Sequence, residues 1–184
     1  MVTAKTTDKQ REERLLKGFK AFVVSAVAVG SISSSLASAG EASANSKLPF
    51  AGSARVSQSA HGDGYGLRAI DLALPAGTPV LAPADAKVVG TCNAGNNHRA
   101  IKLQSGSTFF SLIHVNTPDV FIGKTYRQGQ QIGTVAADRP NNACARSTGV
   151  HLHFGVSPNA PVVDGINLLN VRYNTTIRSS NVRR

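Results

Sequence analysis

Hydrophobic residues of this chain gather in short runs that are separated by turn-forming residues. The runs cover 69–74, 79–82, 87–91, 100–104, 108–114, 131–136 and 150–157. Glycine, proline and asparagine stand between them, as in Pro75-Ala-Gly77 and Gly95-Asn-Asn97. After residue 44 no stretch of useful length repeats its apolar positions with the 3.6-residue period of a helix. The pattern predicts an all-β fold with a small antiparallel, sandwich-like core.

The amino-terminal segment has a different pattern. A polar leader ends in Lys17 and Lys20, and an apolar run follows at 21–30 before a stretch rich in serine and alanine. These are the parts of a secretory signal peptide, whose apolar run is helical. The run is shorter than the roughly 20 residues of a membrane span. A buried core helix and an uncleaved anchor are the alternatives.

This reading divides the chain into four parts. We expect a leader at 1–44, a linker at 45–57, one folded domain at 58–173 and a loose, polar carboxyl-terminal tail at 174–184. One domain accords with a length of 184 residues.

The net charge of +10 indicates an anionic partner, such as nucleic acid, acidic lipid or an acidic wall polymer. Residues 1–44 hold six of the 20 basic and four of the 10 acidic residues, so the remainder keeps 14 basic and 6 acidic residues and a net charge of +8. The basicity therefore belongs to the part that we predict to be exported. Export makes nucleic acid a poor candidate and an envelope polymer a better one.

The two cysteines, Cys92 and Cys144, both follow the leader. An even number of cysteines in an oxidising compartment favours one disulfide, here closing a long loop. Two buried free thiols are the alternative. A zinc site made by the cysteines is excluded, since two thiolates are too few and the pair is not closely spaced.

His151 and His153 interrupt the last apolar run. In a strand they would share one face, about 7 Å apart, while Val150, Leu152 and Phe154 point into the core. Two imidazoles so placed can serve one metal ion and its bound water. A pair of surface histidines is the alternative.

Three further side chains stand out less sharply. Asp71 lies between Ile70 and Leu72, so its carboxylate must leave the apolar face and find a partner or solvent. His114 ends the run at 108–114 and by itself could be a half-buried histidine with satisfied hydrogen bonds. His98 falls beside the turn at 95–97, and we expect it on the surface.

Asp71, His114, His151 and His153 lie within longer motifs. The segment 71–80 reads Asp-Leu-Ala-Leu-Pro-Ala-Gly-Thr-Pro-Val, and 147–154 reads Ser-Thr-Gly-Val-His-Leu-His-Phe. With Ser-Leu-Ile-His at 111–114 and Arg-Gln-Gly-Gln-Gln-Ile-Gly at 127–133, they resemble, in order and spacing, the motifs of the lysostaphin/LytM-type (β-lytic-like) zinc endopeptidases. These enzymes hydrolyse peptidoglycan. The resemblance covers roughly residues 58–158.

The resemblance implies a catalytic groove on one face of the sheet and assigns a role to each polar residue. Asp71 and His153 would bind Zn²⁺. His151 would be the general base on the zinc-bound water, and His114 would assist it or stabilise the tetrahedral intermediate. Two imidazoles and a carboxylate leave the fourth position open, which is typical of catalytic zinc.

One position departs from the family pattern. The first ligand is usually a histidine four residues before the aspartate, and here Leu67 stands there. His61, ten residues before Asp71, is the candidate replacement, because the longer gap is similar to that of the β-lytic branch. The neighbouring Asp63 and Tyr65 are expected to be turn residues.

The resemblance thus predicts a zinc metalloendopeptidase that cuts the stem peptides or cross-bridges of peptidoglycan. We expect it to be monomeric, secreted or held in the periplasm or cell envelope, and attracted to anionic envelope polymers rather than nucleic acid. Two alternatives remain: a catalytically inactive relative that serves as a binding or activator module, and a generic basic β-sandwich binding protein.

Overall fold

The computed structural model describes residues 45–138 and 142–184. The strands are β1 Gly52–Gly62, β2 Arg68–Ala73, β3 Pro79–Leu81, β4 Ala86–Asn93, β5 His98–Ser105, β6 Thr108–Asn116, β7 Thr125–Tyr126, β8 Gln131–Val135, β9 Leu152–Val156, β10 Val162–Val163, β11 Ile166–Asn167 and β12 Thr176–Ser179, with a 3₁₀ helix η1 at Leu168–Asn170. The predicted leader lies outside the described residues. Within them, no helix has the length and apolarity needed to cross a membrane.

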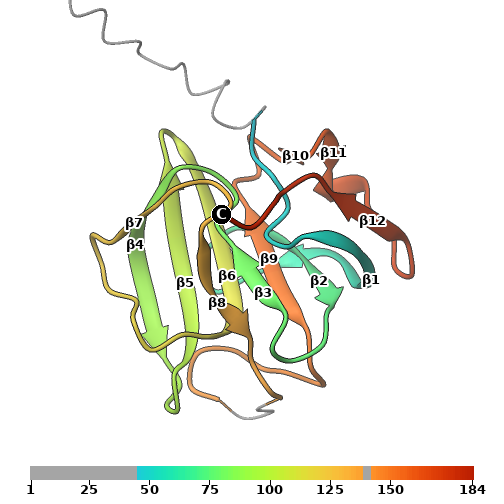
Figure 1. Ribbon diagram of the computed structural model, residues 1–184. Helices are drawn as coiled ribbons and strands as arrows, with labels where there is room; N and C mark the ends of the chain where they lie inside the picture. The colour runs from blue at the N-terminus through green and yellow to red at the C-terminus, as the bar shows by residue number, and fades with distance from the viewer. Residues whose placement is uncertain (1–44, 139–141) are drawn as a thin grey trace, which may run out of the picture. The chain divides into compact units, whose positions relative to one another are not determined.

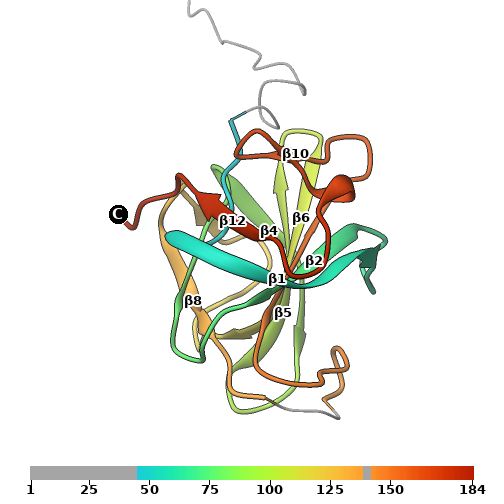
Figure 2. The same cartoon turned by 90° about the vertical axis from the view of Figure 1, so that its right-hand side faces the viewer.

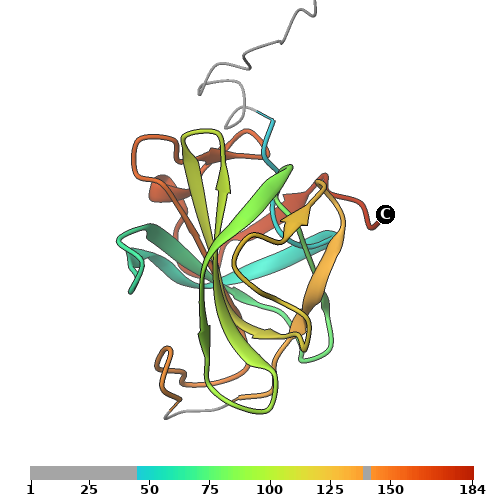
Figure 3. The same cartoon turned by 90° about the vertical axis from the view of Figure 1, so that its left-hand side faces the viewer.

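Ten of the strands form one antiparallel sheet, which confirms the predicted fold class. The strand order is β12-β1-β2-β9-β6-β5-β4-β7, and β8 joins β6 to β3. Strands β9 and β6 lie at the centre, and β3 and β8 cross near them (Figure 1). Figure 2 faces the β1 and β12 edge, and Figure 3 shows the opposite side with the β4 and β5 hairpin.

The two faces of β9 differ: one packs into the hydrophobic core and the other carries a polar side chain. Leu152, Phe154 and Val156 are fully buried in the hydrophobic core, where the rings of Phe154 and Phe110 stack with their centres 6.2 Å apart. The residues between them, His153 and Gly155, point to the other face because side chains alternate along a strand. The apolar face therefore anchors a strand whose opposite face carries a polar side chain.

The segment predicted to be a linker belongs to the core instead. Leu48 and Phe50 are fully buried, and β1 begins at Gly52 with Ala54 and Val56 pointing inward. Serine and glycine obscured this pattern, but the alternation of Ala54 and Val56 with polar neighbours is that of a half-buried strand.

The prediction of a loose carboxyl-terminal tail is also wrong. Strand β12 pairs antiparallel with β1, and Ile177 and Ser179 are buried. Beyond β12, the Asn181 amide donates to the carbonyls of Leu48 and Ala82 at 3.0 and 3.1 Å. Backbone pairing, the Asn181 amide and the one buried apolar side chain of β12, Ile177, hold this mostly polar segment.

Asp164 connects three parts of the chain. It occupies the two-residue turn between β10 and β11 with a φ of 53°, followed by Gly165 at 73°, which is the geometry that Asp-Gly favours. Its carboxylate accepts hydrogen bonds from the backbone N–H of Leu48 at 2.8 Å and the hydroxyl of Ser180 at 2.5 Å. The Lys47 ammonium nitrogen, Nζ, lies 3.4 Å from Asp164 Oδ1. Burial by itself would raise the pKa of Asp164, but these hydrogen bonds and the nearby charge hold it below its usual value.

We predict that Asp164→Asn destabilises the protein by about 2 kcal/mol at neutral pH, because a charged acceptor becomes a neutral one. Asparagine tolerates the positive φ, so the change tests the charge. A carboxylate with a lowered folded-state pKa stabilises the protein above its unfolded pKa, and this contribution is lost as the pH falls through the folded value. Urea unfolding should therefore show a difference between the variants at pH 7 that shrinks below about pH 4. An unchanged difference at low pH would contradict the assignment.

Candidate metal centre

The centre is built on the pairing of β2 with β9. Asp71 lies opposite His153 in the antiparallel register, so both side chains leave the same face of the sheet. Asp71 Oδ1 and His153 Nδ1 are 2.9 Å apart, and both residues are buried. The sequence placed these two residues about eighty positions apart, and the sheet makes them neighbours.

His61 joins them from β1. Two register shifts between β1 and β2 set His61 opposite Ala69, which shares a face with Asp71. His61 Nε2 lies 3.6 Å from Asp71 Oδ1 and 3.3 Å from His153 Nδ1. Its Nδ1 lies 2.8 Å from the carbonyl oxygen of Ser59. Because a carbonyl only accepts, Nδ1 carries the hydrogen and Nε2 offers a lone pair to the centre.

The donor set fits Zn²⁺. One ligand atom from each of His61, Asp71 and His153 lies within 4.8 Å of the others. Nitrogen and carboxylate donors in this number are those of catalytic zinc with an open fourth position. A lone pair of His61 faces the negative charge of Asp71, which is unfavourable unless a cation lies between them. Both observations favour a bound divalent ion.

The surrounding charges support the same conclusion. Burial would lower the pKa of His153, but Asp63 and Asp71 raise it above its ordinary value. Burial would likewise raise the pKa of Asp71, and the contacts with His153, His151 and His61 lower it. The centre is therefore a place of negative potential that attracts positive charge.

His151 stands beside the cluster but just before β9 begins. Its Nδ1 lies 2.8 Å from the carbonyl oxygen of Gly149, so Nδ1 donates and Nε2 is left with a lone pair. Nε2 is 3.7 Å from Asp71 Oδ1. Val150, predicted to point into the core, is 41% exposed, because the strand alternation starts only at Leu152.

His114 contacts His151, with ring centres 4.5 Å apart. It has a φ of 65° and is the extra residue where the register of β5 and β6 shifts between Arg99 and Ala100. Such a bulge re-aims a side chain, and here His114 and the preceding Ile113 both line the groove. Burial, followed by repulsion from His151 and His98, lowers the pKa of His114 to about 3.

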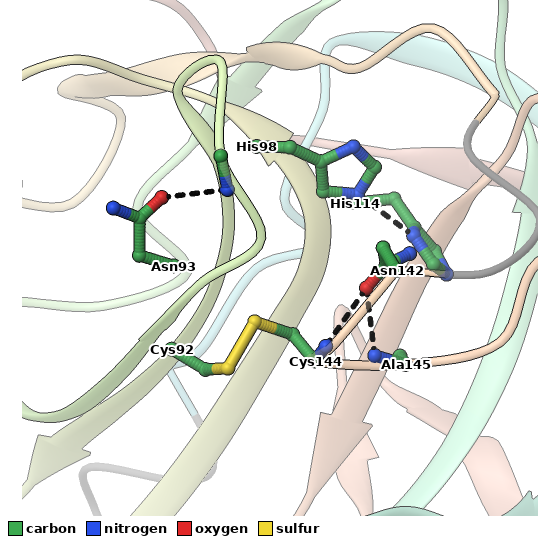
Figure 4. The surroundings of a disulfide bond; sticks show 8 residues. Cys92, Asn93, His98, His114, Asn142, Cys144 and Ala145 are labelled. Carbon is green, nitrogen blue, oxygen red and sulfur yellow. Dashed lines mark hydrogen bonds between the residues drawn. A yellow bond between two sulfur atoms is a disulfide. The ribbon is translucent and has the colours of Figure 1, made fainter.

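The prediction that His98 lies on the surface is wrong. His98 is 3% exposed, and its Nε2 lies 3.1 Å from His114 Nδ1 (Figure 4). It begins β5 and pairs with Asn116, beyond the bulge that contains His114. The only signal in the sequence was that a β-strand starts there. His98 thus fixes the orientation of the His114 ring.

A groove of about 410 Å³ contains these groups. Its lining consists of Gln58, His61, Gly62, Asp63, Gly64, Asp71, Ile113, His114, Cys144, Ala145, Arg146, Ser147, Thr148, His151 and His153. Cys144 forms a disulfide with Cys92 of β4, with Cα atoms 5.7 Å apart (Figure 4). The bond closes a separation of 52 residues, for which chain entropy gives on the order of 4 kcal/mol. It ties one wall of the groove to the sheet.

Comparison with known protein families supports this reading. The family model for peptidase family M23 matches residues 65–165, a little over half of the chain. The match includes Asp71, His114, His151 and His153, and it begins after His61.

Solved structures are similar at low identity. The catalytic domain of the antimicrobial peptidase lysostaphin from Staphylococcus simulans is 21% identical, over 65% of this chain and 84% of that one, with a TM-score of 0.40. A zinc-containing peptidase from Vibrio cholerae is 20% identical, over 70% of this chain and 40% of that one, with a TM-score of 0.47. The M23 metalloprotease pseudoalterin, from the deep sea, is 21% identical, over 61% and 69%, with a TM-score of 0.47. The aligned region thus spans less than half of the Vibrio chain.

We predict that the purified protein binds about one zinc ion per chain and that His61→Ala weakens its affinity by more than about 100-fold. The loss of a ligand should exceed the 10- to 100-fold cost of losing a residue that only supports one. Competition with a chromophoric chelator measures this affinity. His151→Ala is the matched control, because it removes an imidazole from the same groove but not from the three-donor cluster. Wild-type affinity in His61→Ala would exclude His61 as a ligand.

Proposed function

The chain belongs to peptidase family M23, and on that premise we propose that it is an exported zinc endopeptidase that hydrolyses the peptide cross-links of bacterial peptidoglycan. The metallopeptidase class follows from the family, and Zn²⁺ fits the three-donor cluster. The observation that carries the proposal is the convergence of His61, Asp71 and His153 beside His151 in one groove.

Each donor would bind through a defined atom. His61 would use Nε2, since its Nδ1–H is engaged by Ser59. His153 would use Nδ1, the nitrogen that faces both His61 and Asp71. Asp71 would use Oδ1, which lies within 4 Å of both imidazoles. When bound, zinc would polarise the scissile carbonyl and acidify a water molecule.

His151 would act as the general base. Its Nδ1–H is held by the carbonyl of Gly149, so Nε2 is free to accept a proton on the groove side. The same nitrogen could then return the proton to the departing amine. Nε2 lies 3.7 Å from Asp71 Oδ1, beside the cluster, and His151 is not one of the three residues whose ligand atoms form it.

His114 would stabilise negative charge that develops on the substrate oxygen. Its lowered pKa keeps the ring neutral at physiological pH. When His98 Nε2 donates to His114 Nδ1, His114 would carry its own hydrogen on Nε2 and could donate it to an oxyanion. The bulge and His98 together hold this ring in place.

The inactive alternative loses its main argument. That alternative would follow if nothing replaced the ligand missing at Leu67 and if His61 turned away from Asp71 and His153. Leu67 is a core residue that is 5% exposed, and His61 faces both donors. The cluster is therefore complete without a histidine at position 67.

The surface charge supports an envelope substrate. Residues 45–184 carry a net charge of +8, which would attract an anionic polymer through interactions that salt screens over about 8 Å at physiological ionic strength. Export through the leader at 1–44 would bring the enzyme to that polymer, where we propose that it acts as a monomer.

We predict that His151→Ala lowers the rate of cell-wall hydrolysis at least about 100-fold while zinc remains bound, since general base catalysis contributes at least that much. Release of new amino groups from purified peptidoglycan measures the rate, and zinc content and thermal unfolding establish that the variant is intact. A chelator should abolish wild-type activity, and added zinc should restore it. Full activity in metal-free protein would refute the proposal.

A further inference from the structure

Asp63 lies two residues after His61, in the turn that follows β1. Its side chain is fully buried. Oδ1 accepts the backbone N–H groups of Tyr65 at 2.9 Å and Leu67 at 2.8 Å. These bonds explain the turn that the sequence predicts, but they use only one of the two carboxylate oxygens.

The second oxygen, Oδ2, lies near Nε2 of His153, the ring nitrogen that is not directed at His61 and Asp71. Asp63 Oδ2 accepts the hydroxyl of Ser111 at 2.5 Å and lies 3.7 Å from His153 Nε2. This nitrogen is buried and has no hydrogen-bond partner among the described residues. A buried imidazole nitrogen without a partner is costly, and the carboxylate is positioned to receive its hydrogen.

The local packing is arranged around this contact. Gly155, two residues after His153 on β9, has no space for a side chain: a Cβ there would lie 2.1 Å from Ser111 Oγ and 2.7 Å from Asp63 Oδ2. Because Gly155 has no side chain, the Asp63 carboxylate and the Ser111 hydroxyl can lie directly against β9.

We propose that Asp63 is a positioning residue for His153: it accepts the Nε2–H and thereby leaves the Nδ1 lone pair facing His61 and Asp71. The inference rests on the proposed function, in which His153 binds zinc through Nδ1. A carboxylate behind a metal-bound histidine fixes the tautomer, orients the ring and increases its basicity. The short segment from His61 to Asp63 would then supply one zinc ligand, His61, and the residue that positions a second ligand, His153.

The test compares Asp63→Asn with the wild type. Asparagine keeps an oxygen for the turn, but its amide nitrogen would replace Oδ2 and, because it only donates, cannot accept the hydrogen on His153 Nε2. We expect the zinc dissociation constant to rise about 10- to 100-fold in chelator competition. Asp164→Asn is the matched control: it alters another buried turn aspartate far along the chain, and it should lower stability while zinc affinity stays within about twofold.

A second measurement keeps the inference testable if Asp63→Asn does not fold. In the zinc-loaded wild type, ¹⁵N NMR should find the His153 hydrogen on Nε2, protected from exchange. A hydrogen on Nδ1, or equal zinc affinity in folded Asp63→Asn and wild type, would overturn the role of Asp63. If the wild type binds no zinc at all, the proposed function fails instead, so the two failures are distinguishable.

Discussion

The antiparallel pairing that sets Asp71 opposite His153 is the constraint on which the site depends. Side chains alternate along a strand, so a slip of one residue would turn Asp71 into the core and expose Ile70 in the groove. The core prevents this slip: Ile70, Leu72 and Phe154 are fully buried, each contributing on the order of 2 kcal/mol by burial. Apolar packing on one face thus fixes the positions of the polar atoms on the other.

Regular strands alone would not assemble the groove. Asp71 and His153 come from regular pairing, whereas His61 and His114 depend on irregularities in β1 and β6. The left-handed conformation of His114 costs about 1 kcal/mol, which the surrounding sheet must offset. Bulges of this kind are common beside active sites because they direct two neighbouring side chains to one face. The geometry of the groove therefore depends on departures from the regular pairing that builds the sheet.

The contrast explains what could be predicted from the sequence. Period-two runs and turn residues indicated the central strands, and the motif resemblance singled out Asp71, His114, His151 and His153. The prediction of a loose carboxyl-terminal tail was wrong because β12 is held by backbone pairing to β1 and carries few apolar side chains. The prediction that His98 lies on the surface was wrong, and the contact of Asp63 with His153 was not predicted, because each residue acts through a partner distant in sequence that nothing local reveals. The family match likewise begins after His61, where the spacing of this chain departs from the usual pattern.

The buried carboxylates also clarify what the basic charge means. Residues 45–184 have only six acidic residues, and two of them, Asp63 and Asp71, flank the single imidazole of His153. With one divalent ion this group would be neutral, which lowers the cost of holding a dication in a partly buried groove. Without a cation the same carboxylates raise the pKa of His153, so a proton and a metal ion compete for one centre. The excess positive charge therefore belongs to the surface, where it acts over roughly a Debye length, while the candidate metal centre is a small region of negative potential inside a basic protein.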